Sequence, residues 1–211
     1  MIIGFNYPNE TRNRILSVSL TLFAKKGVNA VPLKDIAEIV GMKLSDLNSW
    51  YFTKKDLLND IFHCFANEYN SYLEEVKSSL EEADDLDMAL DVLFSKEILE
   101  VENTMLFLGM SLVIKEQHHN KNAKKCVEEL FFSQAIKTIS EGLLRFFELN
   151  NIHVSNINIA VMHYIIWLTA WNDIRLHDFY GEGIVFSTDI NTELLFLDMR
   201  NKFKGMIMNS I

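Results

Sequence analysis

The chain has 211 residues and a mass of 24.5 kDa, enough for one large domain or two small ones. Hydrophobic residues make up 49% and charged residues 23%, as in folded globular proteins, but only 2 prolines and 8 glycines are present. A fold of many short strands needs more turn residues, so the composition favours an all-α protein. The formal net charge of −9 argues against a general nucleic-acid binder.

The first part of the chain predicts three helices. Apolar residues recur at helical spacing over residues 9–26, and Gly27 follows as a stop. Pro32 suits the first turn of a second helix, because its missing N–H is not needed there, and Gly41 ends that helix after about two turns. A third short helix is expected over residues 44–51.

A series of longer helices is expected to follow. Thr53 is a good N-cap for a helix over residues 54–80, with Asp56 three residues on as an imperfect capping box. About nine helices are expected in total. The later ones span residues 86–99, 104–116, 122–150, 156–179 and 188–208.

The stretch 149–172 contains no Asp, Glu, Lys or Arg. A membrane-spanning helix needs about 20 consecutive apolar residues. The continuous apolar part of this stretch, 159–171, is shorter and has His163 inside it. We therefore expect a buried helix of a soluble protein and no membrane partner.

Cysteine usage bears on the compartment. Cys64 and Cys126 are far apart and belong to no CxxC motif. A disulfide framework is therefore not expected, and a reducing compartment such as the cytoplasm fits.

Charge is distributed unevenly between the two ends. Residues 1–57 hold eight basic and five acidic residues, a net +3, which leaves −12 for the remainder. A basic head on an acidic body is what a protein needs if only one end touches phosphates. The alternative is that the asymmetry arises by chance.

The first 60 residues hold a spaced pattern that fixes hydrophobic positions, two turns and two caps together. Its members are Thr11, Arg12, Ile15, Leu16, Leu22, Phe23, Gly27, Asp35, Ile36, Ala37, Gly41, Met42, Leu47, Trp50, Tyr51, Lys54, Leu57 and Leu58. The pattern is that of a helix-turn-helix and resembles the TetR family of bacterial transcriptional regulators over residues 9–62. The resemblance implies a homodimer with two recognition helices in successive major grooves, and a C-terminal domain that binds a small effector.

Under this resemblance, the third helix is the recognition helix, with Leu47 and Trp50 in the core. DNA contacts are expected from its outward side chains, from the starts of the first and fourth helices, and from a lysine of the second helix. These residues are Thr11, Arg12, Lys34, Lys43, Leu44, Ser45, Asp46, Asn48, Ser49, Thr53 and Lys54. Each lysine has the alternative of being an ordinary solvated side chain, and Asn48 either reads a base or faces solvent.

The head also departs from the family. The usual Ser or Thr caps of the second and third helices are replaced by Val31 or Pro32 and by Lys43, which accept no capping hydrogen bond. Asn48 stands where the family usually has Tyr, and Asp46 repels phosphate unless it accepts from a cytosine amine. DNA binding is still expected.

The C-terminal helices predict a dimer face. The helix over 156–179 is apolar nearly all round, so it must be covered twice, once by its own domain and once by another surface. The last helix carries a second apolar stripe. Its members are Phe196, Met199, Phe203, Met206 and Ile207. These two helices match the family's four-helix dimer interface, and the alternative is a large monomer core.

An effector pocket is expected between the middle helices and the Trp-rich helix, because aromatic and Met side chains line adaptable apolar cavities. Its candidate residues are Phe107, Met110, Phe131, Met162, His163, Tyr164, Trp167 and Trp171. At helical spacing each of them is also consistent with plain core, and His163 with a satisfied core histidine.

An enzyme is not expected. The motifs G-x-S-x-G, P-loop and H-E-x-x-H are absent. His118 and His119 are adjacent in a polar connection and do not face each other on a helix, so neither a metal site nor another cofactor is predicted.

The sequence therefore predicts a helix-turn-helix DNA-binding domain over residues 1–53 and a ligand-binding and dimerisation domain over 54–211, with the helix 54–80 as connector. The predicted function is a ligand-responsive transcriptional regulator, a repressor released from a near-palindromic double-stranded DNA operator by an unidentified small effector. The alternative is an all-α small-molecule-binding protein whose head has lost specific DNA binding.

Overall fold

The computed structural model describes residues 9–94, 105–154, 157–180 and 192–209, without the side chains of residues 172–180 and 192–193. Every regular element in these ranges is helical, which confirms the all-α prediction. Nine helices lie in the described ranges when the unbroken run from Lys121 to Leu149 is counted once. The parts of the expected helices at 95–99, 104, 156 and 188–191 lie outside the described residues.

The chain divides into two compact units. The first, called the head unit, consists of Met1–Glu68 and Glu102–Val127. The second, called the body unit, consists of Tyr69–Val101 and Glu128–Ile211. Helix α4, Lys54–Glu81, contributes residues to both.

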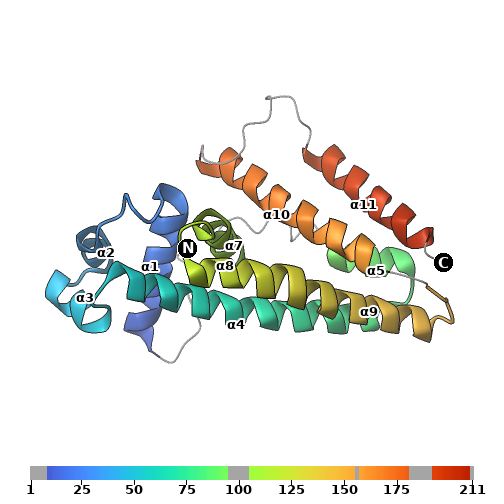
Figure 1. Cartoon of the computed structure of the whole chain (residues 1–211), viewed down its shortest axis with the longest axis horizontal. Coiled ribbons are helices and arrows are strands. Elements are labelled where there is room, and N and C mark those ends of the chain that lie inside the picture. The colour runs from blue at the N-terminus through green and yellow to red at the C-terminus, as the bar shows by residue number, and fades with distance from the viewer. Residues whose placement is uncertain (1–8, 95–104, 155–156, 181–191, 210–211) are drawn as a thin grey trace. The chain divides into compact units, whose positions relative to one another are not determined.

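The head unit begins with α1, Glu10–Lys26, drawn in blue in Figure 1. The Asn9 side chain caps this helix by accepting from the Arg12 backbone N–H at 3.0 Å. Ile15 and Phe23 are fully buried on its inner face. Gly27 then ends the helix with φ +77°, a left-handed conformation that residues with a Cβ rarely adopt.

Two short helices complete the helix-turn-helix. Helix α2, Leu33–Val40, ends at Gly41, whose left-handed φ of +79° lets its N–H reach back to carbonyls of α2. Helix α3, Leu44–Trp50, follows at once. Helix α2 packs against both α1 and α3, so the short third helix is held in place through the second.

Helix α7, Met105–Glu116, packs against α1 within the head unit. Lys115 Nζ donates to the Ala24 carbonyl at 3.3 Å. Gly109 lies so close to the Phe65 ring that a Cβ there would overlap it. The helix-turn-helix is therefore backed by residues that are distant in sequence.

The body unit is built from long helices. Helix α8, Lys121–Cys126, belongs to the head unit and leads without a break through the π-helix η1, Val127–Gln134, into α9, Ala135–Leu149, of the body unit. Helix α9 passes close to the later part of α4, where the ideal Cβ of Gly142 lies 3.2 Å from the Lys77 Cα. The sequence predicted one α-helix over 122–150 and gave no sign of the π segment.

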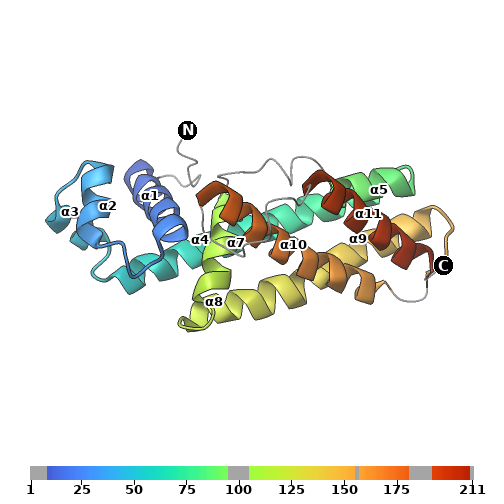
Figure 2. The same ribbon diagram turned by 90° about the horizontal axis from the view of Figure 1, so that it is seen from above.

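The remaining body helices are α5, Leu86–Leu93, α10, Asn158–Tyr180, and α11, Thr192–Met208. Helix α10 packs against both α9 and α11, and Figure 2 shows α10 and α11 in the orange and red part of the colour range. No helix among the described residues is both long and apolar enough to cross a membrane.

Candidate nucleic-acid interface and effector region

In the recognition-helix candidate α3, one side chain is buried and the others are exposed. Leu47 is fully buried and anchors it. The six side chains predicted to point outward are all exposed, which confirms their placement. They are Lys43, Leu44, Ser45, Asp46, Asn48 and Ser49. Inside this set Ser49 Oγ donates to the Asp46 carbonyl at 2.6 Å, so Asn48 and Lys43 are the less constrained polar groups.

The prediction that Trp50 belongs to the core is wrong, since the side chain is 42% exposed. Tyr51 takes the core position instead and is 6% exposed. The reason is that α3 ends at Trp50, and the extended backbone of Tyr51, with φ −137°, turns its ring inward. Phe52 follows with 85% exposure. Two large exposed aromatic side chains therefore lie at the end of the recognition helix, and periodicity gave no signal for either.

The helix caps agree with the sequence prediction. Neither Pro32 at α2 nor Lys43 at α3 makes a side-chain capping hydrogen bond. Before α4 the box is complete: the Asp56 N–H donates to Thr53 Oγ1 at 3.1 Å, and the Thr53 N–H donates to Asp56 Oδ2 at 3.0 Å. Side chains thus cap the start of α4, whereas α2 and α3 depend on packing for their stability.

Arg12 has a partner within the chain. Its Nη2 lies 2.6 Å from Oδ1 of Asp60 on α4, and its Nε donates to the other carboxylate oxygen at 3.1 Å. The Tyr51 hydroxyl also donates to Asp60. Arg12 thus joins α1 to α4, and its contact with a DNA phosphate stays a prediction.

The pKa values of this cluster follow from its geometry. Burial opposes ionisation of Asp60, but hydrogen bonds from Arg12 and Tyr51 outweigh it and hold the pKa of Asp60 below its usual value. Burial and the bond to Asp60 raise the pKa of Tyr51. The hydrogen bond to Asp60 raises the pKa of Arg12. Asp60 is therefore ionised and Tyr51 neutral at physiological pH.

The other predicted phosphate contacts lie at three places on the head. Thr11 and Lys34 are exposed on α1 and α2. Lys54 is half-buried, and its Nζ donates to the Val28 carbonyl at 2.8 Å. Lys54 thus also holds the turn between α1 and α2, and its ammonium group has two further hydrogens to offer.

The body unit contains a cluster of aromatic side chains from α10, α11 and Phe94, the residue that follows α5. The Phe94 ring lies at the centre of the cluster. Its centroid is 5.2 Å from that of Tyr164 and 5.5 Å from those of Trp167 and Phe203. Trp167 stacks on Trp171 at 5.6 Å. Three predicted effector residues, Tyr164, Trp167 and Trp171, are therefore brought together, while Phe94 was not predicted.

Polar atoms inside this cluster are unequally satisfied. The Tyr164 hydroxyl donates to the Leu93 carbonyl at 2.7 Å, and burial raises the pKa of Tyr164 well above its ordinary value. Trp171 Nε1 is buried and has no hydrogen-bond partner among the described residues. An unpaired buried donor costs about 1–3 kcal/mol, so this N–H marks a point where an acceptor would be favourable.

The remaining effector candidates lie elsewhere. Phe131 is buried against Tyr69, with ring centroids 5.2 Å apart. Phe107 and Met110 belong to α7 of the head unit. Met162 is exposed on α10. His163 is exposed there as well, with Nδ1 2.8 Å from the Ile159 carbonyl, so its interpretation as a core histidine is wrong.

The apolar stripe predicted on α11 as a dimer face is wrong for three of its five members. Phe196, Phe203 and Ile207 are buried within the chain, and the two phenylalanines face the aromatic cluster around Phe94. Met199 and Met206 are partly exposed. The exposed apolar side chains of α11 include Leu194 and Leu197, at 63% and 51%.

Helix α10 presents to solvent a side that is apolar apart from His163. Ile159, Met162 and Ile166 are 53%, 37% and 47% exposed. Their spacing of three and four residues puts them on one side of the helix. This exposed side of α10 is called the outer apolar face below.

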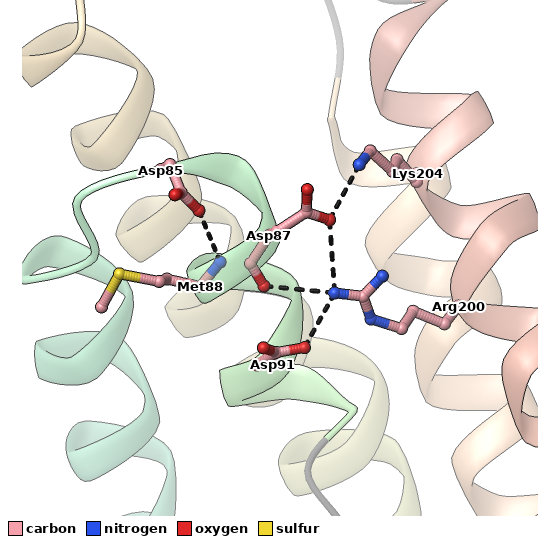
Figure 3. A network of polar contacts seen from close by, with 6 residues as sticks. All are labelled: Asp85, Asp87, Met88, Asp91, Arg200 and Lys204. Atoms are coloured by element: carbon pink, nitrogen blue, oxygen red, sulfur yellow. Dashed lines mark hydrogen bonds and ion pairs between the residues drawn. The ribbon is translucent and has the colours of Figure 1, made fainter.

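An ion-pair network joins α5 to α11 (Figure 3). Arg200 Nη2 lies 2.8 Å from Asp91 Oδ1, and Lys204 Nζ lies 2.8 Å from Asp87 Oδ1. The hydrogen bond from Lys204 lowers the pKa of Asp87. Asp85 caps α5 by accepting from the Met88 N–H at 2.8 Å. The network is exposed, so it orients α11 rather than contributing much stability.

Comparisons with known proteins bear on this architecture. No protein-family model matches the sequence. The transcriptional repressor KstR2 of Rhodococcus jostii is 30% identical over 71 residues, 33% of this chain and 35% of KstR2. The transcriptional regulator LuxR of Vibrio harveyi is 22% identical over 101 residues, 48% of this chain and 44% of LuxR. The matches thus span about a third of the length of KstR2 and less than half of the length of LuxR.

Solved structures match over nearly the whole chain. A protein of Mesorhizobium loti, named as a TetR-family transcriptional regulator, superimposes with a TM-score of 0.70 at 14% identity, covering 94% of this chain and 95% of that one. GusR of Salmonella enterica gives a TM-score of 0.66 at 14% identity, covering 96% and 98%. The chain has the fold of TetR-family regulators. KstR2 and the Mesorhizobium loti protein are both named as regulators of transcription, and neither is named as an enzyme.

Proposed function

We propose that the protein is a TetR-type transcriptional regulator that binds double-stranded DNA as a homodimer, represses transcription and is released by a small effector. The observation that carries the proposal is the helix-turn-helix, in which buried Leu47 holds α3 while its polar side chains remain exposed. A recognition helix needs this combination of a fixed backbone and a free outer face. The named functions of KstR2 and LuxR support it. Such a regulator works where chromosomal DNA is, in the cytoplasm.

On DNA, the side chains divide by role. Asn48 and Asp46 on α3 are the candidates for base edges, since Asn pairs with adenine and Asp accepts from cytosine. The phosphate contacts come from cations and helix starts. They are Thr11, Arg12, Lys34, Lys43, Thr53 and Lys54, with Leu44, Ser45 and Ser49 packing along the groove. To these we add Trp50, a half-exposed side chain whose indole N–H is suited to a phosphate oxygen.

The outer apolar face is the proposed dimer surface. Ile159, Met162 and Ile166 of α10 leave an apolar helix side in water, and a contiguous patch of this kind marks an interaction site. A second copy of the chain would cover the same patch on both partners. With two heads in fixed separation, the operator is near-palindromic, with half-sites about 34–36 Å apart or a multiple of it.

The effector region is proposed for the aromatic cluster of the body unit. The unpaired Trp171 N–H supports a ligand that brings a hydrogen-bond acceptor to an apolar, aromatic surface. In this assignment residues 1–53 bind DNA, residues 54–211 bind effector and dimerise, and the helix over 54–80 connects them. Binding must then be reciprocal: operator lowers effector affinity by the factor with which effector lowers operator affinity.

The test is a selection of binding sites from random duplexes with the purified protein. A palindromic preference whose affinity falls steeply with salt supports the proposal. Asn48→Ala is expected to relax one base position at a cost of about 1–3 kcal/mol. A base preference that Asn48→Ala leaves unchanged at every position would refute the base-reading role of Asn48 alone.

The second candidate function is a small-molecule-binding protein without specific DNA binding. The uncapped starts of α2 and α3 and the carboxylate of Asp46 on the recognition helix favour it. In the same selection, this candidate predicts no enriched sequence and only weak, salt-sensitive binding.

A further inference from the structure

A cleft of about 750 Å³ opens in the head unit, lined by the start of α4 and the turn between α7 and α8. Lys54 and Lys55 come from α4, and Lys121 comes from the start of α8. The two elements are tied together where Asn122 Nδ2 donates to Asn59 Oδ1 at 2.8 Å. The cleft therefore has a fixed frame built from elements more than 60 positions apart in the sequence.

The charge of this cleft is opposite to that of the chain. Its lining contains the three lysines, His119 and a single carboxylate, Glu116, which gives +2 with neutral His119, against −9 for the whole chain. None of the three ammonium groups forms an ion pair with a carboxylate of the described residues. Lys54 Nζ donates one hydrogen bond, to the Val28 carbonyl. The three lysine cations outnumber the single carboxylate, so they repel one another, and an anion between them would relieve that repulsion.

The size and the donors of the cleft define what fits. Its volume lies within the range of small-molecule sites. The lysine ammonium groups make short, charge-assisted hydrogen bonds to phosphate and carboxylate oxygens. Lys121 lies at the start of α8, outside the helix-turn-helix. One of the three cations of the cleft therefore does not belong to the elements proposed to contact DNA.

We propose that this cleft binds the phosphate or carboxylate group of a small anionic molecule, at a site separate from the aromatic cluster of the body. The proposal does not depend on the DNA-binding function. Where that function holds, the bound anion uses the charge of Lys54 and so weakens the phosphate contact proposed for the same side chain.

The experiment uses inorganic pyrophosphate as the probe and the full-length protein. Affinity is measured by calorimetric titration at constant ionic strength, set with sodium chloride. The test variant is Lys55→Gln with Lys121→Gln, both exposed side chains, and Lys54 is kept because it holds the Val28 carbonyl. The control is Arg14→Gln with Lys26→Gln, which removes the same charge from exposed side chains of the head unit outside the cleft.

The wild type and the control are expected to bind pyrophosphate alike, with the test variant at least about tenfold weaker, because two charge-assisted hydrogen bonds are lost. Unchanged melting temperature of the variant excludes misfolding as the cause. Equal affinity in all three proteins overturns the proposal. So does a test variant that binds pyrophosphate normally but shows a DNA salt slope about two units smaller, because the cleft then serves the DNA backbone.

Discussion

Arg12 Nη2 lies 2.6 Å from Asp60 Oδ1, and this contact joins the first helix of the head to the fourth. The same carboxylate accepts from the Tyr51 hydroxyl at the end of α3. One partly buried anion therefore ties together three helices on which the position of the recognition helix depends. The buried Cys64 Sγ also lies 3.6 Å from Arg12 Nη2, so the guanidinium contacts two side chains of α4.

Asp60→Asn is expected to lower the free energy of unfolding by about 1–3 kcal/mol near pH 7, because it removes charge-assisted bonds to Arg12 and Tyr51. The folded-state pKa of Asp60 is depressed, so its contribution is present above the unfolded pKa of about 4 and is lost as pH falls through the folded pKa. Urea unfolding at a series of pH values checks this. The gap to wild type should close in acid.

Glu74→Gln, an exposed carboxylate on the same helix, is the matched control and should leave stability nearly unchanged at every pH. A pH-independent gap for Asp60→Asn would contradict the electrostatic explanation and leave only a packing effect.

The sequence predicted the helices well because periodicity and caps are local. Gly27, Gly41 and the Thr53–Asp56 box mark helix ends that the structure confirms. It failed at Trp50, because a core assignment at a helix end depends on where the next residue turns. The extended backbone of Tyr51 turns its ring inward, and the hydroxyl then finds a tertiary partner, Asp60, that local sequence does not reveal.

Other predictions failed because they also depend on tertiary contacts. The apolar stripe with Phe196 and Phe203 has the same sequence pattern whether it faces the chain's own core or a partner. In the structure both rings contact Phe94, so they face the chain's own core. The basic cleft was invisible because Lys55 and Lys121 lie 66 positions apart in the sequence. The π segment has no sequence signal that distinguishes it from the α-helices around it.

Gly109→Ala is expected to destabilise the head unit by about 1–3 kcal/mol, because the new methyl group would overlap the Phe65 ring where α7 meets α4. Gly205→Ala on α11 is the control. Nothing lies within 4 Å of its ideal Cβ, so the better helix propensity of Ala should stabilise by up to about 1 kcal/mol. Thermal unfolding of both variants checks the opposite signs, and equal shifts would show that helix propensity alone is being measured.

Lys43→Ala is expected to weaken binding to all DNA sequences alike and to reduce the slope of log affinity against log salt by about one unit, because one phosphate contact is lost. Its melting temperature should be unchanged or slightly higher, since a cation at a helix N-terminus is unfavourable. Lys54→Ala should give the same change of slope with a lower melting temperature, because it also loses the Val28 carbonyl. Fluorescence anisotropy at several salt concentrations measures the slopes, and an unchanged slope for Lys43→Ala removes it from the interface.

Ile166→Glu is expected to convert the proposed dimer into a folded monomer, because it puts a charge on the outer apolar face. Leu144→Glu is the control, an exposed leucine of α9 outside that face. Phe203→Glu should instead unfold the body unit, since Phe203 is 3% exposed within the chain. Sedimentation velocity with circular dichroism separates the three outcomes, and a dimeric Ile166→Glu would place the interface elsewhere.

Trp171→Phe tests the unpaired donor. The substitution keeps an aromatic ring beside Trp167 but removes Nε1. Without ligand, relief of the unpaired donor should offset the cost of the smaller ring and leave stability close to wild type. An effector that accepts from this N–H should bind the variant about 5- to 10-fold more weakly, as expected for the loss of one hydrogen bond of about 1–1.5 kcal/mol. Trp167→Phe is the matched control, because it changes a neighbouring tryptophan of the same cluster. The measurement is the calorimetric affinity of both variants for any compound that dissociates the protein from its operator. Equal losses of affinity in the two variants would mean that ring area, and not the Trp171 donor, holds the effector.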